Sequence, residues 1–183
     1  MSDTRTRILD AGIECVMRNG LHGASMSVIA ARAGVSKALL HYHFTDRAQL
    51  LRDLVLTLGT RLVERERAVF AGSATASAVD LLWSWMEWEL RRGELQALLE
   101  LRSTRDALVR EAQAQVAAMR RITSVGTVNR LFVRLGLTPR VPADLIGATT
   151  LVFLDGLALA HEPGRDTRAS FDVFLLAILS LAD

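Results

Sequence analysis

The sequence is poor in several residue types that mark particular classes of protein. Its 183 residues include one cysteine, Cys15, so an internal disulfide cannot form and a reducing, cytoplasmic location is expected. Half of the residues are hydrophobic, yet no uninterrupted apolar run reaches the roughly 18 to 20 residues that span a membrane. The charged N-terminus MSDTRTR shows no secretory or transit segment. We therefore expect a soluble protein with no membrane partner.

Sequence motifs of catalytic and metal sites are also missing. The chain has no HExxH, no GxSxG and no glycine-rich phosphate loop. Four histidines and one cysteine do not supply a usual zinc site, and His41 and His43, two residues apart, would point to different faces of a helix. We therefore expect neither enzyme activity nor a cofactor nor a bound metal.

Proline is scarce too, and its placement indicates the fold class. All three prolines follow residue 138. Strand-like alternation is absent, whereas apolar residues recur at helical spacing along the whole chain. The sequence therefore predicts an all-α protein of about nine helices.

Residues 26–45, MSVIAARAGVSKALLHYHFT, describe two short helices that cross tightly. Ser27 is a plausible N-cap of the first helix, Gly34 fits a left-handed helix end, and Ser36 can cap the second helix. This is the pattern of a helix-turn-helix. The outward face of the second helix would carry Lys37, Leu39, Tyr42 and His43. Geometry alone leaves open whether this corner touches DNA or is an ordinary pair of helices.

The charge of the chain is divided unevenly. Residues 1–52 hold seven basic and four acidic residues, a balance of +3, whereas residues 53–183 hold fifteen and sixteen, a balance of −1. Phosphate contacts depend on local charge, so a positive helix-turn-helix end favours DNA as a partner. The alternative is an ordinary imbalance on a solvated surface.

The flanks of this stretch carry further motifs. They include a Thr-Arg-x-x-Ile-Leu opening at residues 4–9, an Asn-Gly helix stop at 19–20, Ala-Gly-Val-Ser-Lys at 33–37 and the aromatic run at 40–44. From residue 4 to about residue 54 the chain resembles the N-terminal domain of TetR-family transcriptional regulators. The resemblance implies a three-helix DNA-binding head at 1–50, with its helix-turn-helix at 26–45. A helical ligand-binding and dimerisation body would then occupy 51–183.

The resemblance also implies DNA-binding roles for particular residues. Lys37, the only lysine beside 21 arginines, would reach a phosphate or a guanine edge. Leu39 departs from the smaller residues usual at its position, which leaves contact with a thymine methyl group. The remaining predicted contacts are to the DNA backbone, with Tyr42 also able to reach a base: Ser27, Ser36, Tyr42, His43 and Arg47.

The C-terminal body carries no signature of its own, but its aromatic residues are concentrated. Such side chains would suit a small apolar or aromatic molecule, and we predict that the pocket is lined by Trp83, Met86, Trp88, Met119, Phe153 and Asp155. The alternative is that these residues are plain core. For Asp155, which interrupts an apolar helix, structural pairing is the first interpretation.

The last two predicted helices, about 143–161 and 167–181, are apolar on more than one side. A second copy of the same pair would cover them, and the resemblance implies a homodimer built in this way; a monomer core is the alternative. We therefore expect a bacterial, ligand-responsive repressor that a small effector releases from a palindromic double-stranded DNA operator. The alternatives are a helical dimer without an effector, and a helical ligand-binding protein or enzyme that does not bind DNA.

Overall fold

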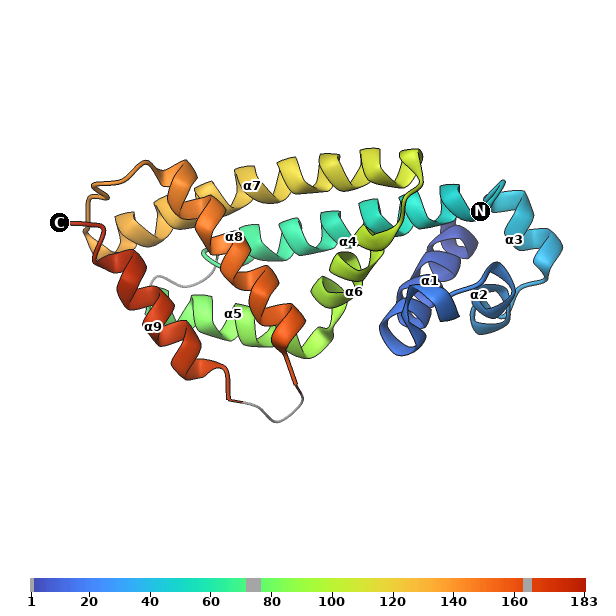
Figure 1. Ribbon diagram of the computed structural model, residues 1–183, viewed down its shortest axis with the longest axis horizontal. Coiled ribbons are helices and arrows are strands. Elements are labelled where there is room, and N and C mark those ends of the chain that lie inside the picture. The colour runs from blue at the N-terminus through green and yellow to red at the C-terminus, as the bar shows by residue number, and fades with distance from the viewer. Residues whose placement is uncertain (1, 72–76, 163–165) are drawn as a thin grey trace. The chain divides into compact units, whose positions relative to one another are not determined.

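The computed structural model describes residues 2–71, 77–162 and 166–183 (Figure 1). The described residues form nine α-helices and one short 3-10 helix. In chain order these are α1 (Ser2–Gly23), α2 (Met26–Ala33), α3 (Lys37–His43), α4 (Arg47–Ala68), α5 (Ala78–Arg92), α6 (Glu94–Glu100), η1 (Leu101–Ser103), α7 (Ala107–Leu135), α8 (Ala143–Ala160) and α9 (Arg168–Leu179). The prediction of an all-α protein is confirmed, and most predicted helix boundaries agree with the structure to within three residues.

The end of the first helix differs slightly from the expectation. Helix α1 extends to Gly23, but Gly20 has φ 70° and ψ 174°, so a kink divides it into two helical segments. The Asn-Gly pair therefore produces a sharp kink, after which one more turn leads into α2. A left-handed φ is accessible to glycine because it has no Cβ.

Contacts between residues divide the chain into two compact units. Unit 1 comprises Met1–Arg61 with Gly93–Ala117, and unit 2 comprises Leu62–Arg92 with Ala118–Asp183. The boundaries fall inside α4 and α7, and unit 1 includes α6, which packs against α1. The functional division into a head at 1–50 and a body at 51–183 stays a prediction.

Unit 1 is built around the apolar face of α1. This face is made of five buried residues: Ile8, Leu9, Gly12, Cys15 and Val16. A Cβ added at Gly12 would lie 2.9 Å from the Leu54 side chain, so the missing side chain lets Leu54 of α4 approach α1 closely. This packing gives α2 and α3 a rigid support.

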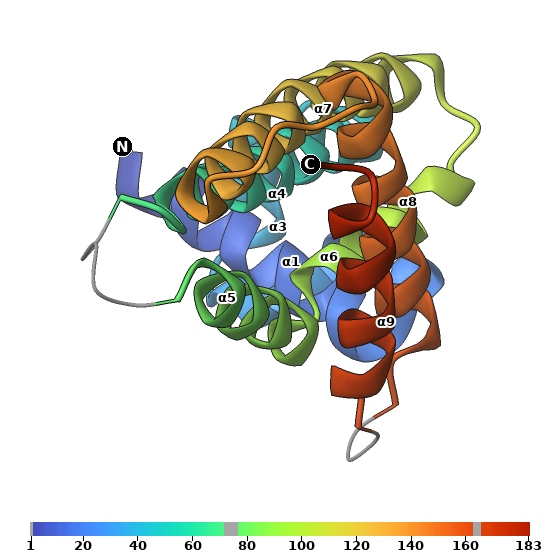
Figure 2. The same cartoon turned by 90° about the vertical axis from the view of Figure 1, so that its left-hand side faces the viewer.

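Unit 2 has its core between α7, α8 and α9. Val128, Phe132, Ile146 and Ile178 form a buried cluster. The Ser124 hydroxyl donates to the Gly147 carbonyl at 3.0 Å and satisfies a polar pair at the buried contact of α7 with α8. In both views α8 and α9 lie side by side (Figures 1 and 2), and the rings of Phe153 and Phe174 stack between them with centroids 3.9 Å apart.

Helix α8 is unusually apolar. With 18 residues and a mean hydropathy of 1.6, it is the one helix in the described segments that is long and apolar enough to cross a membrane by length and composition alone. The sequence interpretation did not count it because acidic and hydroxyl residues interrupt it. Only 22% of the helix is buried inside the chain, and its exposed residues include Leu145, Val152 and Leu159.

Candidate functional site

The corner between α2 and α3 is fixed by hydrogen bonds at each helix end. Ser25 caps α2, its hydroxyl accepting from the Val28 N–H at 3.3 Å. Gly34 ends α2 with φ 63°, in the left-handed region, as the sequence indicated. Ser36 then caps α3, accepting from the Leu39 N–H at 3.1 Å, also as predicted. The expected N-cap Ser27 is wrong by two residues, because Ser27 lies within the first turn of α2.

Helix α3 has one buried side and one exposed side. Leu40 is buried in α3, and Phe44, which ends the helix, is buried as well. Lys37, Leu39 and Tyr42 are exposed, the last with 69% of its surface accessible. His43 is half-buried, and its ring meets the Tyr42 ring edge-on at 5.3 Å. These predicted DNA-contact residues are therefore exposed or half-buried on a short helix whose N-terminus is capped by a side chain.

Two further predicted contact residues flank this helix. Ser27 is exposed in the first turn of α2. Arg47 is exposed at the start of α4, and its Nη2 donates to the carbonyl oxygen of Leu21 at 2.8 Å. The start of α4 is capped by two hydrogen bonds: the Gln49 N–H donates to Asp46 at 2.8 Å, and the Thr45 N–H donates to the Gln49 side chain at 2.7 Å.

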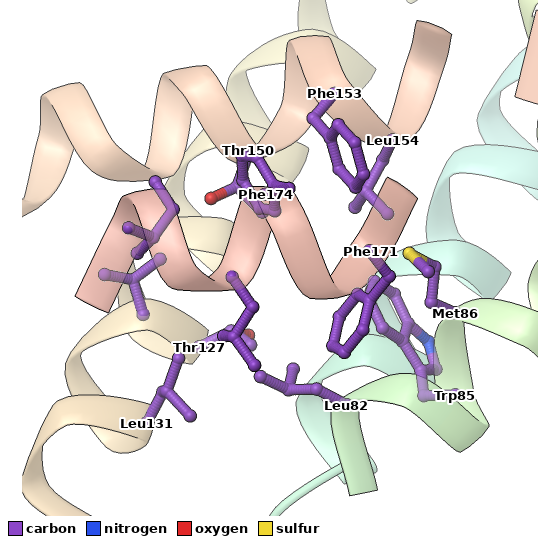
Figure 3. A pocket seen from close by; sticks show the side chains of 13 residues that line it. Leu82, Trp85, Met86, Thr127, Leu131, Thr150, Phe153, Leu154, Phe171 and Phe174 are labelled. Carbon is purple, nitrogen blue, oxygen red and sulfur yellow. The ribbon is translucent and has the colours of Figure 1, made fainter. Parts of the chain in front are cut away.

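Unit 2 encloses a small apolar cavity of about 40 Å³ (Figure 3). Aromatic and aliphatic side chains from α5, α7, α8 and α9 line it: Leu82, Trp85, Met86, Thr127, Val128, Leu131, Thr150, Phe153, Leu154, Phe171, Phe174, Leu175 and Ile178. A space of this size admits one or two water molecules, and a larger occupant requires the walls to move apart. The indole Nε1 of Trp85 is buried without a hydrogen-bond partner.

The predicted pocket residues fall partly inside this cavity. Met86 and Phe153 line it, whereas Trp83, Trp88, Met119 and Asp155 do not. The Trp83 ring packs against Phe171 and the Arg168 guanidinium, and Trp88 is covered by Arg65 and Arg92. Asp155 pairs with Arg120 at 2.6 and 3.3 Å.

Sequence reasoning missed Trp85 and most of the α9 lining. Trp85 belongs to the second apolar stripe of α5. Because this helix is apolar on two sides, the sequence alone does not show which stripe faces the cavity. Phe171 and Phe174 lie three apart in α9, a spacing that puts both on one face. This spacing is visible in the sequence, but the sequence does not show that this face of α9 packs against α5.

A buried carboxylate lies beside the cavity wall. Glu66 of α4 is only 5% exposed, and burial raises the pKa of its carboxyl from 4.5 to about 7. A hydrogen bond with Thr127, a cavity residue, and the guanidinium groups of Arg120 and Arg130 lower the pKa by less, while Glu89 raises it. The Glu89 carboxylate itself accepts two hydrogen bonds from the Arg65 guanidinium, at 2.6 and 2.9 Å. Among the side chains that the structure describes, no cluster of three histidine, cysteine or acidic residues could hold a metal ion.

The fold and these two sites define the class of protein: an all-helical chain with a helix-turn-helix near its N-terminus and an apolar cavity in its C-terminal helices. The sequence pattern of bacterial regulatory proteins of the tetR family matches residues 8–54. Over this segment the chain carries the N-terminal domain of the TetR family. This family consists of regulators, not enzymes, so the enzymatic alternative is set aside.

Known relatives agree with this assignment at different lengths. The HTH-type nicotine-responsive transcriptional repressor HdnoR of Paenarthrobacter nicotinovorans is 33% identical over 89 residues, which span 46% of this chain and less than half, 46%, of that repressor. The HTH-type transcriptional regulator BetI of Escherichia coli K12 is 27% identical over 175 residues, covering 91% of this chain and 88% of BetI. A transcriptional regulator from Saccharomonospora viridis, solved in complex with choline, has the same fold with a TM-score of 0.73 and 21% identity, over 97% of this chain and 96% of that one.

The buried Glu66 carboxyl predicts a pH dependence of stability. In the folded chain the Glu66 carboxyl stays protonated up to a pH of about 7, whereas in the unfolded chain it loses its proton near pH 4.5. The folded state therefore binds more protons within this window, and the free energy of unfolding should fall as pH rises from 4.5 to 7 and then level off. Glu66→Gln should remove this fall and stabilise the protein at pH 8 by roughly 3 kcal/mol, measured by urea unfolding at fixed protein concentration.

Glu64→Gln is the matched control, because Glu64 is two residues away in α4 and exposed. It should leave the pH profile unchanged. Parallel profiles for the wild type and Glu66→Gln would show that Glu66 is ionised throughout this range.

Proposed function

We propose that this chain is a sequence-specific DNA-binding transcriptional regulator, namely a repressor that a small, mainly apolar molecule releases from a palindromic operator. The observation that carries the proposal is the capped helix α3, which buries Leu40 and leaves Lys37, Leu39 and Tyr42 exposed. A short, rigidly supported helix with a basic residue at its start is suited to enter the major groove. The net positive charge of residues 1–52 supports the same partner.

The proposed contacts divide into base readout and phosphate binding. Lys37 would reach a guanine edge or a phosphate, Leu39 would pack on a thymine methyl group, and Tyr42 would contact a base or the backbone. The Ser36 hydroxyl is occupied by the Leu39 N–H, so its region would bind phosphate mainly through the free N–H groups of the first turn of α3.

Phosphates on either side would be held by residues outside this face. Ser27 is exposed at the start of α2. His43 could donate from its imidazole. Arg47 donates one of its five N–H groups to the Leu21 carbonyl. This hydrogen bond holds the guanidinium in place, while its other N–H groups can donate to a phosphate.

The DNA proposal is tested with a duplex that the wild-type chain selects from a random-sequence library. Lys37→Ala should weaken binding to this duplex and reduce the slope of log affinity against log salt by about one unit, because one phosphate or base contact with a cation is lost. Binding is measured by fluorescence anisotropy between 50 and 300 mM salt.

Arg121→Ala provides the control, since Arg121 is an exposed cation of α7 outside the head. It should leave both the affinity and the slope unchanged. Equal affinity and slope for Lys37→Ala and the wild type would remove Lys37 from the interface. Selection of no duplex at all would favour a helical ligand-binding protein that does not act on DNA.

The cavity of unit 2 is the proposed effector site. Its lining is almost wholly aliphatic and aromatic, and the Trp85 N–H lacks a hydrogen-bond partner. These features favour an aromatic molecule with one hydrogen-bond acceptor, for which the side chains would have to separate. HdnoR is described as nicotine-responsive, and the Saccharomonospora viridis regulator was solved with choline, so small organic molecules are reasonable effectors here too.

Quinoline, an aromatic ring system with one acceptor, is a suitable probe of this site. It should raise the thermal midpoint of the chain and weaken binding of the selected duplex. Phe153→Ala enlarges the cavity and should strengthen quinoline binding about tenfold, measured as a larger midpoint shift at equal concentration. Trp88→Ala removes an aromatic ring outside the lining and should leave quinoline affinity unchanged. Equal responses of both variants, or none, would favour a helical dimer without an effector.

The last two helices are the proposed dimer interface. Exposed apolar residues recur along them at helical spacing, at Leu145, Val152, Leu159, Val173 and Leu176. Gly156 lies in the same stripe, and an added Cβ there would meet no atom within 4 Å, which leaves room for another helix. We therefore assign the largely unburied apolar surface of α8 to a second copy of the chain, not to a membrane.

Val152→Glu should convert the dimer into a monomer at micromolar concentration, because it places a charge in the proposed interface. Val133→Glu is the matched control: Val133 is 78% exposed and Val152 is 73% exposed, but Val133 lies on α7. Light scattering distinguishes the two variants. A dimer that survives Val152→Glu, or one that is lost with Val133→Glu, contradicts the assignment.

The dimer gives the effector a way to act. Two heads would insert α3 into successive major grooves about 34 to 36 Å apart. An effector that binds better to a conformation with another head spacing lowers DNA affinity through linkage, without touching the DNA surface. The protein would work in the cytoplasm, where its DNA lies and Cys15 stays reduced.

A further inference from the structure

The backbone of Leu21 is held on both sides by charged side chains from distant parts of unit 1. Its N–H donates to Glu100 Oε1 at 2.6 Å, although Glu100 lies 79 residues further along the chain, at the end of α6. Its carbonyl oxygen accepts from Arg47 Nη2 at 2.8 Å. One residue of the α1 kink thus connects the end of α6 to the start of α4.

The kink at Gly20 makes this connection possible. Because φ of Gly20 is 70°, the Leu21 N–H leaves the regular hydrogen-bond pattern of α1 and needs another acceptor. The Glu100 carboxylate takes this place, and a Cβ on Gly20 would lie only 2.7 Å from Glu100 Oε1. Glycine at this position therefore serves both the backbone conformation and the close approach of the carboxylate.

The helix that carries Glu100 is also fixed at its other end. Glu94, the first residue of α6, is buried, and Arg61 lies 4.0 Å from its carboxylate. The same guanidinium pairs with Asp10 of α1. Glu100 is therefore presented from a helix that is held against α1, so its position relative to Leu21 is well defined.

We propose that Glu100, which lies outside the helix-turn-helix, is a positioning residue for DNA binding that fixes Leu21 and thereby orients Arg47. This inference rests on the proposed phosphate contact of Arg47 and goes beyond it. Arg47 has a flexible side chain, and holding one donor on a fixed carbonyl reduces the entropy lost when other donors bind a phosphate. With the Glu100 bond removed, the Leu21 carbonyl no longer has a fixed place, and Arg47 loses its anchor.

Two substitutions of Glu100 separate the hydrogen bond from the charge. Glu100→Gln and Glu100→Ala each remove one negative charge, but only glutamine retains an oxygen that can accept from the Leu21 N–H. We expect Glu100→Ala to bind the selected duplex about tenfold more weakly than Glu100→Gln, with a salt slope lower by about one unit, as for Arg47→Ala. A purely structural role would change the thermal midpoint but not this slope.

A double-mutant cycle tests whether Glu100 acts through Arg47. In an Arg47→Ala background, Glu100→Ala should reduce affinity less than twofold, because the group that it positions is already absent. Glu100 is exposed, so its truncation leaves no core cavity. Glu100→Asp is a second variant that keeps the charge but is one methylene shorter, and it should match alanine and not glutamine.

The outcomes separate the two proposals. Equal affinities of Glu100→Ala and Glu100→Gln, or fully additive effects with Arg47→Ala, would overturn the positioning role while leaving the DNA-binding proposal intact. An unchanged salt slope in Arg47→Ala would refute its phosphate contact and with it this inference, although the Lys37 result could still stand. Failure of the wild type to select a duplex would overturn the proposed function itself.

Discussion

The orientation of α3 depends on a backbone constraint at the corner between α2 and α3. Gly34 in the left-handed conformation ends α2, and its N–H and that of Val35 close onto carbonyls of the last turn of α2. Ser36 starts α3 only two residues later. A corner this short leaves α3 few possible directions, and burial of Leu40 and Phe44 selects one of them. The backbone of the corner, together with the burial of Leu40 and Phe44, therefore determines which side of α3 is exposed.

The strong preference for arginine over lysine has a structural counterpart. Arginines serve ion pairs with partly or fully buried carboxylates, including Arg65 with Glu89 and Arg120 with Asp155, each through two hydrogen bonds. A planar guanidinium suits this geometry, whereas an ammonium group does not. The single lysine, Lys37, instead lies exposed at the start of α3, where a compact cation can meet either a phosphate or a base.

Local signals explain how much of this fold could be predicted from the sequence. The helix end at Gly34 and the cap at Ser36 depend on neighbours within one or two turns, and both were predicted correctly, whereas the cap of α2 is Ser25 and not Ser27. The cavity lining could not be read in the same way, because it depends on which faces of α5, α8 and α9 meet. The tryptophans of α5 show the difference: Trp85 lines the cavity, while Trp83 and Trp88 are covered by arginines instead.

The packing of α6 against α1 could not be predicted from the sequence either, since it depends on contacts such as Glu100 with Leu21, 79 residues apart. This packing gives the effector proposal a physical route. Helix α5 supplies Leu82, Trp85 and Met86 to the cavity, and only Gly93 separates α5 from α6 in the chain. Wall movement that admits a ligand would therefore act on a helix that is covalently continuous with α6. Because α6 packs against α1 and Glu100 accepts from the Leu21 N–H, strain that enters α6 at Gly93 would act on this hydrogen bond.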